Sequence, residues 1–519
     1  MSELDYDLVI VGGGINGCGI ARDAAGRGLK VLLLEQDDLA SATSSWSSKL
    51  IHGGLRYLEQ YEFRLVRESL QEREVLLKLA PHLIQPLEFI LPHDRNMRPA
   101  WMVRLGLFMY DHIGGKISLP VSRGVSFPDQ QYSAGLKSSI RQGFFYSDAR
   151  VDDARLTVLN AVSAREHGAE IRTRTRMTSG KRVGDLWQIA MTNIDTGETS
   201  EARARGIVNA AGPWVKQLLD DAVHIHMTAT VKLVKGSHIV VPRVHDQQHA
   251  YILQNDDRRV VFIIPFEERF SLIGTTDVNV ESVEVGHQIS KAEIAYLIRA
   301  VNRFLAKPLH EADVVWSYAG VRPLYDDGAA NPSEITRDYV FKTDHQNGRL
   351  PLLSIFGGKI TTYRRLAEHA LEELGPYFPG LSKAWTADEV LPGGDLDSLP
   401  EAIHALTRKH PSLPIDYLGC LVSRHGTRTE SLLKGVRNMA DLGELFGAGA
   451  TLLSQREIDF CIKEEWARKP DDILWRRTKC GLHMDAAERL RAATFIETRV
   501  AALIKLTTRT SIHAPTGGI

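Results

Sequence analysis

The sequence predicts an α/β protein with a separate helical domain at its C-terminal end. A strand–helix–strand pattern opens the chain, strand-like and helical runs alternate up to about residue 390, and the pattern beyond is almost purely helical. A chain of 519 residues also exceeds one ordinary core, so two or three domains are expected. We therefore expect two interleaved domains in residues 1–390 and a C-terminal helical domain in residues 391–519.

The first unit of the chain has the pattern of a dinucleotide-binding βαβ motif. A buried strand, Asp7 to Val11, precedes a helix, Ile15 to Arg27, and a second strand, Lys30 to Leu34. The turn before the helix has the pattern G-x-G-x-x-G, with its glycines at Gly12, Gly14 and Gly17. Glycines allow the tight turn, the close approach of a pyrophosphate and tight helix packing, and the phosphates then lie at the positive end of the helix. The unit is therefore predicted to be Rossmann-like.

Glu35 follows the second strand directly. Its carboxylate can accept hydrogen bonds from an adenosine ribose and would repel a 2′-phosphate. The alternative is a charge at a strand end with no ligand. The position of the motif near the N-terminus favours FAD, although an NAD site has the same local geometry.

Strand-like and helical runs continue to alternate after this first unit. The further runs are the strands Gly206–Ala210, Ser237–Val241, Val260–Ile264 and Leu352–Phe356 and the helices Arg64–Ala80, Arg155–His167 and Lys291–Phe304. This alternation predicts a Rossmann-like FAD-binding domain interleaved with a sheet-containing substrate domain.

The helical character of the C-terminal part begins after the segment Leu391–Asp395. Four apolar residues share one predicted helical face there: Ile458, Cys461, Ile462 and Trp466. The residues from Asp485 to Glu488 have the pattern of a capping box, and the residues from about Thr507 have the character of a frayed tail.

Three later stretches combine glycines with hydroxyl side chains. The turn Asn209–Trp214 can pass close to a dinucleotide, or it can be an ordinary strand exit. The stretch Ser44–Tyr57 can hold phosphate and flavin oxygens, or it can be a polar surface loop. The stretch Phe356–Arg364 directs a helix N-terminus at the flavin, where it would stabilise the anionic reduced ring. The predicted cofactor-binding residues are Gly12, Gly14, Gly17, Glu35, Thr43, Ser44, Ser48, Gly54, Ala211, Gly212, Gly358 and Thr361.

Six segments together resemble one family of flavoproteins. They are GGGINGCGIARDAAGRG, TSSWSSKLIHGGLRYLE, KGSHIVV, GTTD, AGVRPL and FGGKITTYR. In combination they are similar to FAD-dependent glycerol-3-phosphate dehydrogenases, and to the bacterial aerobic form in particular. The resemblance implies a glycine-oxidase-like FAD fold, oxidation of sn-glycerol 3-phosphate to dihydroxyacetone phosphate, membrane association and ubiquinone as electron acceptor. No DxDxDG calcium loop is found near the C-terminus, which disfavours the mitochondrial form.

The basic residues inside these segments suit a phosphate monoester, which carries nearly two negative charges. The predicted substrate clamps are Arg56, Arg322, Arg337 and Lys359, with hydroxyl contacts from Tyr57 and Thr275. Loss of hydride from C2 to the flavin requires that the C2 hydroxyl proton also leaves, and histidine is a suitable base near neutral pH. We expect His238 to be this base, with His52 as the second candidate. Arg322 and Lys359 could instead stabilise the developing alkoxide.

The segment from about residue 88 to 116 is a candidate membrane surface. Its core, Trp101 to Tyr110, is apolar on nearly every side if helical, so it is either buried or in contact with lipid. It is too short to span a bilayer. Basic residues surround it, as at an anionic lipid interface: Arg95, Arg98, Arg104, Lys116 and Arg123. Because the resembled family must reach a quinone in the bilayer, we expect peripheral binding to the inner face of the cytoplasmic membrane. A homodimer is also possible.

Composition excludes several other classes. A net charge of -1 argues against nucleic-acid binding, and no helix-forming apolar stretch is long enough to span a membrane. Four cysteines without paired spacing indicate neither a zinc site nor a disulfide framework, so we expect no metal and a reducing cytoplasm. We also expect no signal peptide. The remaining rivals are a glycerol-3-phosphate oxidase that uses dioxygen, an amine or amino-acid oxidase, and a catalytically silent flavin-binding protein.

Overall fold

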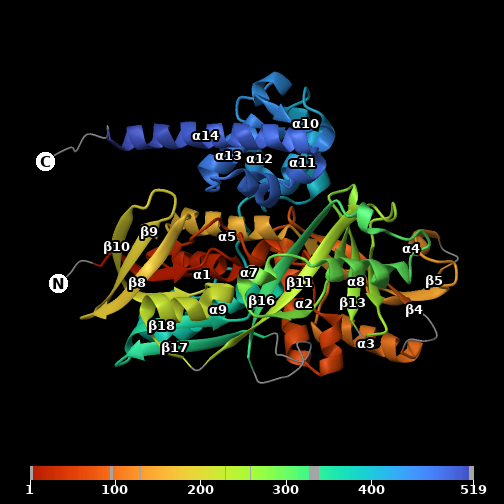
Figure 1. Ribbon diagram of the computed structural model, residues 1–519, viewed down its shortest axis with the longest axis horizontal. Helices are drawn as coiled ribbons and strands as arrows, with labels where there is room; N and C mark the ends of the chain where they lie inside the picture. Colours follow the sequence, from red (N-terminus) through yellow and green to blue (C-terminus); the bar gives the residue numbers. More distant parts are fainter. Residues whose placement is uncertain are drawn as a thin grey trace.

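A computed structural model shows a large α/β body with a smaller helical domain packed on one side (Figure 1). It describes residues 4–93, 98–127, 130–227, 229–257, 259–326 and 338–512. The predicted fold class, α/β with a C-terminal helical domain, is confirmed.

The first sheet has eight strands and contains the predicted βαβ unit. Its parallel centre has the order β18-β10-β1-β2-β7, and β17, β9 and β8 extend it antiparallel. The strands are β1 (Tyr6–Val11), β2 (Val31–Leu34), β7 (Glu170–Arg172), β8 (Thr175–Val183), β9 (Leu186–Asn193), β10 (Thr199–Asn209), β17 (Val340–Gln346) and β18 (Arg349–Phe356). The carboxyl ends of β1 and β10 therefore meet at one edge, where parallel sheets bind ligands.

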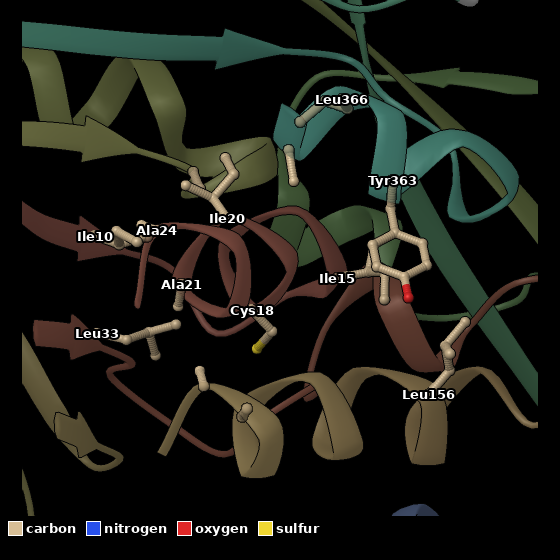
Figure 2. Close-up of a cluster of buried hydrophobic side chains, with 14 of the residues drawn as sticks. Ile10, Ile15, Cys18, Ile20, Ala21, Ala24, Leu33, Leu156, Tyr363 and Leu366 are labelled. Carbon is tan, nitrogen blue, oxygen red and sulfur yellow. The ribbon is translucent and has the colours of Figure 1, made fainter. Parts of the chain in front are cut away.

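The helix of this unit, α1 (Ile15–Gly26), is buried between α5 (Asp153–Glu166) and α9 (Tyr363–Leu374). Cys18 of α1 and Tyr363 of α9 belong to one apolar cluster (Figure 2). Apolar packing on both sides holds the N-terminal turn of α1 in place, which matters because that turn forms a wall of the cavity described below.

The second sheet has ten strands and mixed directions. Its order is β15-β11-β14-β13-β12-β4-β6-β3, with β16 paired to β11 and β5 to β6. The strands are β3 (Leu50–Ile51), β4 (Ile84–His93), β5 (Arg123–Ser126), β6 (Gln142–Val151), β11 (Val231–Pro242), β12 (Ala250–Gln254), β13 (Val260–Phe266), β14 (Phe270–Gly274), β15 (Val278–Val280) and β16 (Trp316–Tyr325). Helix α8 (Lys291–Asn302) covers one face, and α2 (Phe63–Leu79) and α3 (Ala100–Ile113) pack on the other.

The C-terminal domain contains helices and one very short ladder. Its main elements are α10 (Leu399–Lys409), α11 (Ile415–His425), α13 (Gln455–Glu464), α14 (Ala486–Ile512), and the strands β19 (Leu445–Phe446) and β20 (Leu453–Ser454). Ile458, Cys461 and Ile462 share a buried face, as predicted. Trp466 does not share this face. Helix α13 ends at Glu464, Trp466 itself has a positive φ of 55°, and its side chain packs against the apolar cluster that contains Cys18 and Tyr363. The predicted frayed tail is helical to Ile512, and residues 513–519 lie outside the described part.

Helix α3 lies at the edge of the body opposite the helical domain (Figure 1), and one of its faces is apolar and exposed. Leu107 and Tyr110 are buried, whereas Trp101, Leu105 and Phe108 are 66%, 52% and 51% exposed. The alternative that this segment is wholly core therefore does not hold. No helix in the part of the chain that the structure describes has the length and apolar character needed to cross a membrane.

Candidate active site

A cavity of about 980 Å³ is lined by residues from both sheets. Eleven of the twelve predicted cofactor residues lie in its walls: Gly12, Gly14, Glu35, Thr43, Ser44, Ser48, Gly54, Ala211, Gly212, Gly358 and Thr361. Gly17 lies behind the wall. A Cβ at Gly17 would approach the Gly12 oxygen to 1.9 Å, so its role is close packing of helix and turn.

Gly12 shows why the turn before α1 requires glycine. Its φ is +116°, and a Cβ there would lie 2.4 Å from the Ala210 oxygen, where β10 ends. Any side chain would push the two strand ends apart. The turn and the first residues of α1 thereby line the cavity, at the helix N-terminus where anions bind.

Glu35 lines the cavity, and its carboxylate is held by two backbone amides. Its two oxygens accept hydrogen bonds from the backbone amides of Gly13 and Asp37, each at 2.7 Å. Burial nevertheless raises the pKa of Glu35 to about 7, while the amide of Gly13 acts in the opposite direction.

The loop of residues 43–49 is fixed by its own hydroxyl groups. Ser44 Oγ accepts the amide of Ile15 at 2.9 Å, and Thr43 Oγ1 donates to the Val321 oxygen at 2.6 Å. Part of the predicted hydroxyl cluster therefore shapes the loop itself, while Thr43, Ser44 and Ser48 also line the cavity.

The residues present fit a flavin dinucleotide. Asn16 lines the cavity, and its buried Oδ1 has no hydrogen-bond partner among the described residues, so an acceptor is available for a ligand donor. A Cβ at Gly358 would lie 2.7 Å from Asn16 Nδ2, so only glycine leaves this wall open. Glu35, the glycine turn before α1 and Thr361 all line this one cavity, which has the glycine turn and following acidic residue of a dinucleotide site.

Arg322 and Asp277 form the centre of a charged group in the wall of the cavity. Arg322 Nη1 donates to Asp277 Oδ1 at 2.6 Å, and Nη2 donates to Thr275 Oγ1 at 3.3 Å. Arg56 Nη1 lies 3.9 Å from the second oxygen of Asp277. A Cβ at Gly236 would come within 2.5 Å of Arg322 Nη2, so the glycine on β11 makes room for the guanidinium.

The remaining predicted substrate residues join this group where the structure describes them. Lys359 Nζ lies 4.0 Å from the centre of the Tyr57 ring, and both residues line the cavity. Arg337 lies outside the described residues. Asp277 was missed by the sequence reasoning, although it is the last residue of the Gly-Thr-Thr-Asp segment that contributed to the family resemblance.

His238 is separated from the cavity, unlike His52. Its side chain is 1% exposed, is not part of the cavity wall, and contacts Ser48 Oγ through Nε2 at 2.9 Å. It stacks on Tyr318, with ring centres 4.9 Å apart. Burial, with Arg322 and Lys49 nearby, holds the pKa of His238 well below its usual range. His52 lines the cavity, and its backbone amide donates to Thr361 Oγ1 at 3.3 Å.

Comparison with known families gives two matches. Residues 7–364 match the FAD dependent oxidoreductase family, and residues 384–505 match the C-terminal domain of alpha-glycerophosphate oxidase. Together they cover both the cavity-bearing body and the helical domain.

Individual proteins are similar over nearly the whole chain. An aerobic glycerol-3-phosphate dehydrogenase of Escherichia coli K12 is 51% identical, over 94% of this chain and 97% of that protein. A D-erythritol 1-phosphate dehydrogenase of Brucella abortus is 49% identical, over 95% and 97%. The crystal structure of a glycerol-3-phosphate dehydrogenase from Bacillus halodurans, complexed with FAD, is 25% identical with a TM-score of 0.70, over 96% of this chain and 95% of that one.

Proposed function

The chain belongs to the family of FAD-dependent glycerol-3-phosphate dehydrogenases, and we propose that it oxidises sn-glycerol 3-phosphate to dihydroxyacetone phosphate. The observation that carries the substrate proposal is the charged group in the wall of the cavity. Three cationic side chains, Arg56, Arg322 and Lys359, and the carboxylate of Asp277 leave two net positive charges. That excess matches a phosphate monoester, which carries about 1.5 to 2 negative charges near neutral pH.

FAD, when bound, supplies the acceptor for the two electrons and the hydrogen that leave C2 as hydride. The hydroxyl proton must leave as well, and we place its acceptor at His52. His52 lines the cavity, whereas His238 lies behind Ser48 and is held neutral by burial. His238 then positions Ser48, and Arg322 and Lys359 stabilise the oxygen as negative charge develops on it.

The direct test is anaerobic mixing of the purified holoprotein with sn-glycerol 3-phosphate while the flavin absorption is recorded. We expect the flavin to be bleached, with one dihydroxyacetone phosphate formed for each flavin reduced. Arg322→Ala should abolish the bleaching while FAD stays bound. An oxidised flavin after long incubation of the wild type with this substrate would contradict the proposal.

A second substrate is supported by the similarity to the erythritol phosphate enzyme. That relative is 49% identical, almost as similar as the aerobic glycerol-3-phosphate dehydrogenase at 51%. Both substrates carry a phosphate and a secondary alcohol, so the same cationic group serves either. We expect the three-carbon substrate to have the higher kcat/KM, and a higher kcat/KM with D-erythritol 1-phosphate would reverse the assignment.

For the electron acceptor we propose ubiquinone, reached from the inner face of the cytoplasmic membrane through α3. Tyr110 on the buried side of α3 accepts a hydrogen bond from the Gly53 amide at 2.8 Å, beside the cavity loop, while the opposite side of the helix is exposed and apolar. One side of α3 thus contacts Gly53, next to the cavity residue Gly54, and its opposite side forms the proposed lipid-binding surface. Dioxygen is the competing acceptor. Formation of one hydrogen peroxide for each substrate oxidised would show that dioxygen, and not a quinone, accepts the electrons.

The basic flank of α3 gives weaker support than its apolar face. Arg98 pairs with Glu59 at 2.8 Å, Arg104 donates to Ser122 Oγ at 2.7 Å, and Arg123 lies over the Phe145 ring at 4.0 Å. Lys116 is exposed, and Arg95 lies outside the described residues. We therefore propose that binding depends mainly on the apolar side chains. The possible homodimer stays a prediction.

A further inference from the structure

A short segment of the C-terminal domain lies against both loops that form the cavity wall. This clamp segment, residues 472–479, begins with the π-helical turn η11 (Asp472–Arg477). The two loops are residues 35–42, which begin with Glu35, and residues 43–49. The clamp segment contacts them, directly or through one or two intervening residues, at four places.

The first contact joins Asp38 to two consecutive arginines. Arg477 donates to both oxygens of Asp38, at 2.6 and 2.8 Å, and Arg476 Nε donates to the same carboxylate at 2.6 Å. Asp38 and Arg477 are both completely buried. Asp38 does not line the cavity, so this contact holds the 35–42 loop from its far side.

The second contact joins the same loop to the start of the clamp segment. Arg174 pairs with Asp37 and also donates to Asp472 at 2.7 Å. Asp37 in turn donates its amide to Glu35 at 2.7 Å. The position of the Glu35 carboxylate thus depends on a residue that is tied to the C-terminal domain.

The third contact reaches the 43–49 loop through the start of α5. Lys479 pairs with Asp152, the residue that caps α5. The next residue, Asp153, accepts hydrogen bonds from Ser47 Oγ and from Lys49 Nζ, each at 2.8 Å.

The fourth contact is aromatic. Trp475 stacks on Trp316, with ring centres 4.9 Å apart, and Trp316 lies 6.1 Å from Trp46. Trp46 belongs to the 43–49 loop and lines the cavity. The clamp segment therefore has both polar and apolar contacts to the loops that would enclose FAD.

We infer that the clamp segment makes the C-terminal domain a determinant of FAD retention, with Arg476 and Arg477 as positioning residues. Contacts that served only to hold the two domains together could lie anywhere on the interface between them. Here the contacts converge on two loops whose other side lines the cavity, and a loop held in its binding conformation loses less entropy when the ligand binds. The inference concerns FAD and does not depend on which alcohol is oxidised.

The test compares FAD binding in Arg477→Gln, Arg476→Gln and a matched control, Arg155→Gln. Arg155 is also completely buried and also joins the two domains, through Glu465, but its side chain does not contact either loop. The rate of FAD release from each holoprotein and the Kd of FAD rebinding are read from flavin fluorescence. Hydrogen exchange of residues 35–49 is measured after FAD release, and thermal unfolding reports overall stability.

We expect both clamp variants to raise the Kd of FAD by about tenfold or more, with faster exchange in residues 35–49. The control should lose thermal stability while the Kd changes less than about threefold. If Arg477→Gln does not fold, Arg476→Gln is decisive, because its side chain is partly exposed and the Arg477–Asp38 pair remains. Equal changes in Kd for clamp and control variants, or an unchanged Kd in Arg476→Gln, would overturn the inference.

Discussion

The guanidinium of Arg322 donates to the carboxylate of Asp277 at 2.6 Å, and both groups line the cavity. A carboxylate beside a proposed phosphate site opposes anion binding, so its presence calls for a reason. Asp277 lies between Arg322 and Arg56, at 2.6 and 3.9 Å, and fixes the direction of two long side chains. Asp277 thus orients the two guanidinium groups, but it also weakens their attraction for the phosphate.

Asp277→Asn should therefore have opposite effects on binding and turnover. Removal of the negative charge should strengthen competitive inhibition by inorganic phosphate, because the cations lose their counter-charge. The kcat for the alcohol should fall about tenfold or more, because Arg322 is no longer held in position. Inhibition constants and kcat measured at one pH check this, and unchanged values of both would show that Asp277 does not orient the cations.

Glu293 supports the segment that carries Thr275 and Asp277. Its carboxylate accepts from Ser237 at 2.7 Å and from Thr276 at 2.9 Å, and it pairs with Lys235 at 2.7 Å. Glu293→Gln should lower the free energy of unfolding and raise KM, while FAD release stays unchanged because no loop of the dinucleotide site is involved.

The stabilisation by Glu293 should also depend on pH. Although burial acts in the opposite direction, the hydrogen bonds from Lys235 and its neighbours lower the pKa of Glu293 to about 2. A carboxyl with a lowered pKa in the folded state stabilises it fully above its unfolded pKa, and the effect is lost as the pH falls through the folded value. The difference between wild type and Glu293→Gln should be at most about 3 kcal/mol at pH 6 and should shrink below about pH 4.5. A difference that stays constant down to acid pH would contradict this.

Glu35 predicts a different pH dependence for the cofactor. With its pKa raised to about 7, its carboxyl is increasingly protonated in the empty site below that pH. Ribose hydroxyl groups bind the ionised form, so the affinity for FAD should fall as the pH drops from 8 to 6. Titration of FAD into the apoprotein across this range measures the effect. Glu35→Gln should bind FAD more weakly and without this pH dependence, and a pH-dependent variant would point to another group.

The two histidines should be separable by the rate of flavin reduction. His52→Asn should slow reduction by about 100-fold or more, because general bases contribute about 10²–10⁴-fold. His238→Asn keeps a hydrogen-bonding group near Ser48 and should retain most of the rate. Stopped-flow measurement at saturating substrate distinguishes the two, and the reverse order would return the base to His238.

The exposed face of α3 gives a prediction about membranes. The triple variant Trp101→Ser, Leu105→Ser and Phe108→Ser should lose binding to anionic liposomes, because each large apolar side chain contributes about 1.5–3 kcal/mol when buried. It should remain folded and yellow and reduce a soluble dye normally, yet fail to reduce quinone in the bilayer.

A matched control replaces three apolar residues exposed elsewhere, Val183, Ile194 and Leu490, by serine. This control should sediment with the liposomes as the wild type does. Equal losses in both variants would mean that α3 has no special role, and unfolding of the α3 variant would mean that its exposed side chains stabilise the fold.

The parts of the fold that could be predicted from the sequence have local signals. The helix predicted from Ile15 to Arg27 is observed as Ile15–Gly26, because the glycine turn and the flanking strands define its start and end within a few residues. The segment from Trp101 to Tyr110 was ambiguous, because an apolar helix has the same pattern in a core and on a lipid-facing surface. The exposure of Trp101, Leu105 and Phe108 shows that the segment is not wholly core, and lipid contact stays a prediction.

The parts that could not be predicted depend on contacts between distant residues. Asp38 and Arg477 are 439 positions apart, and no spacing rule connects them. His238 was predicted to be the base because it lies in the segment KGSHIVV, and nothing in the neighbouring sequence indicates how deeply its side chain is buried. Its burial follows from Tyr318 on β16, which pairs with β11 although β12 to β15 and α8 lie between the two strands in the chain.

The order of strands in the first sheet also limits when the protein can acquire its cofactor during synthesis. The glycine turn leaves the ribosome before the strands that complete its sheet, because β1 pairs with β10, which starts at Thr199, and β10 pairs with β18, which starts at Arg349. Contacts over such distances close only after the intervening chain exists. The nascent chain must therefore carry an unformed FAD site until β18 is made, and the edge of β1 that later pairs with β10 is a surface that chaperones would have to protect until then.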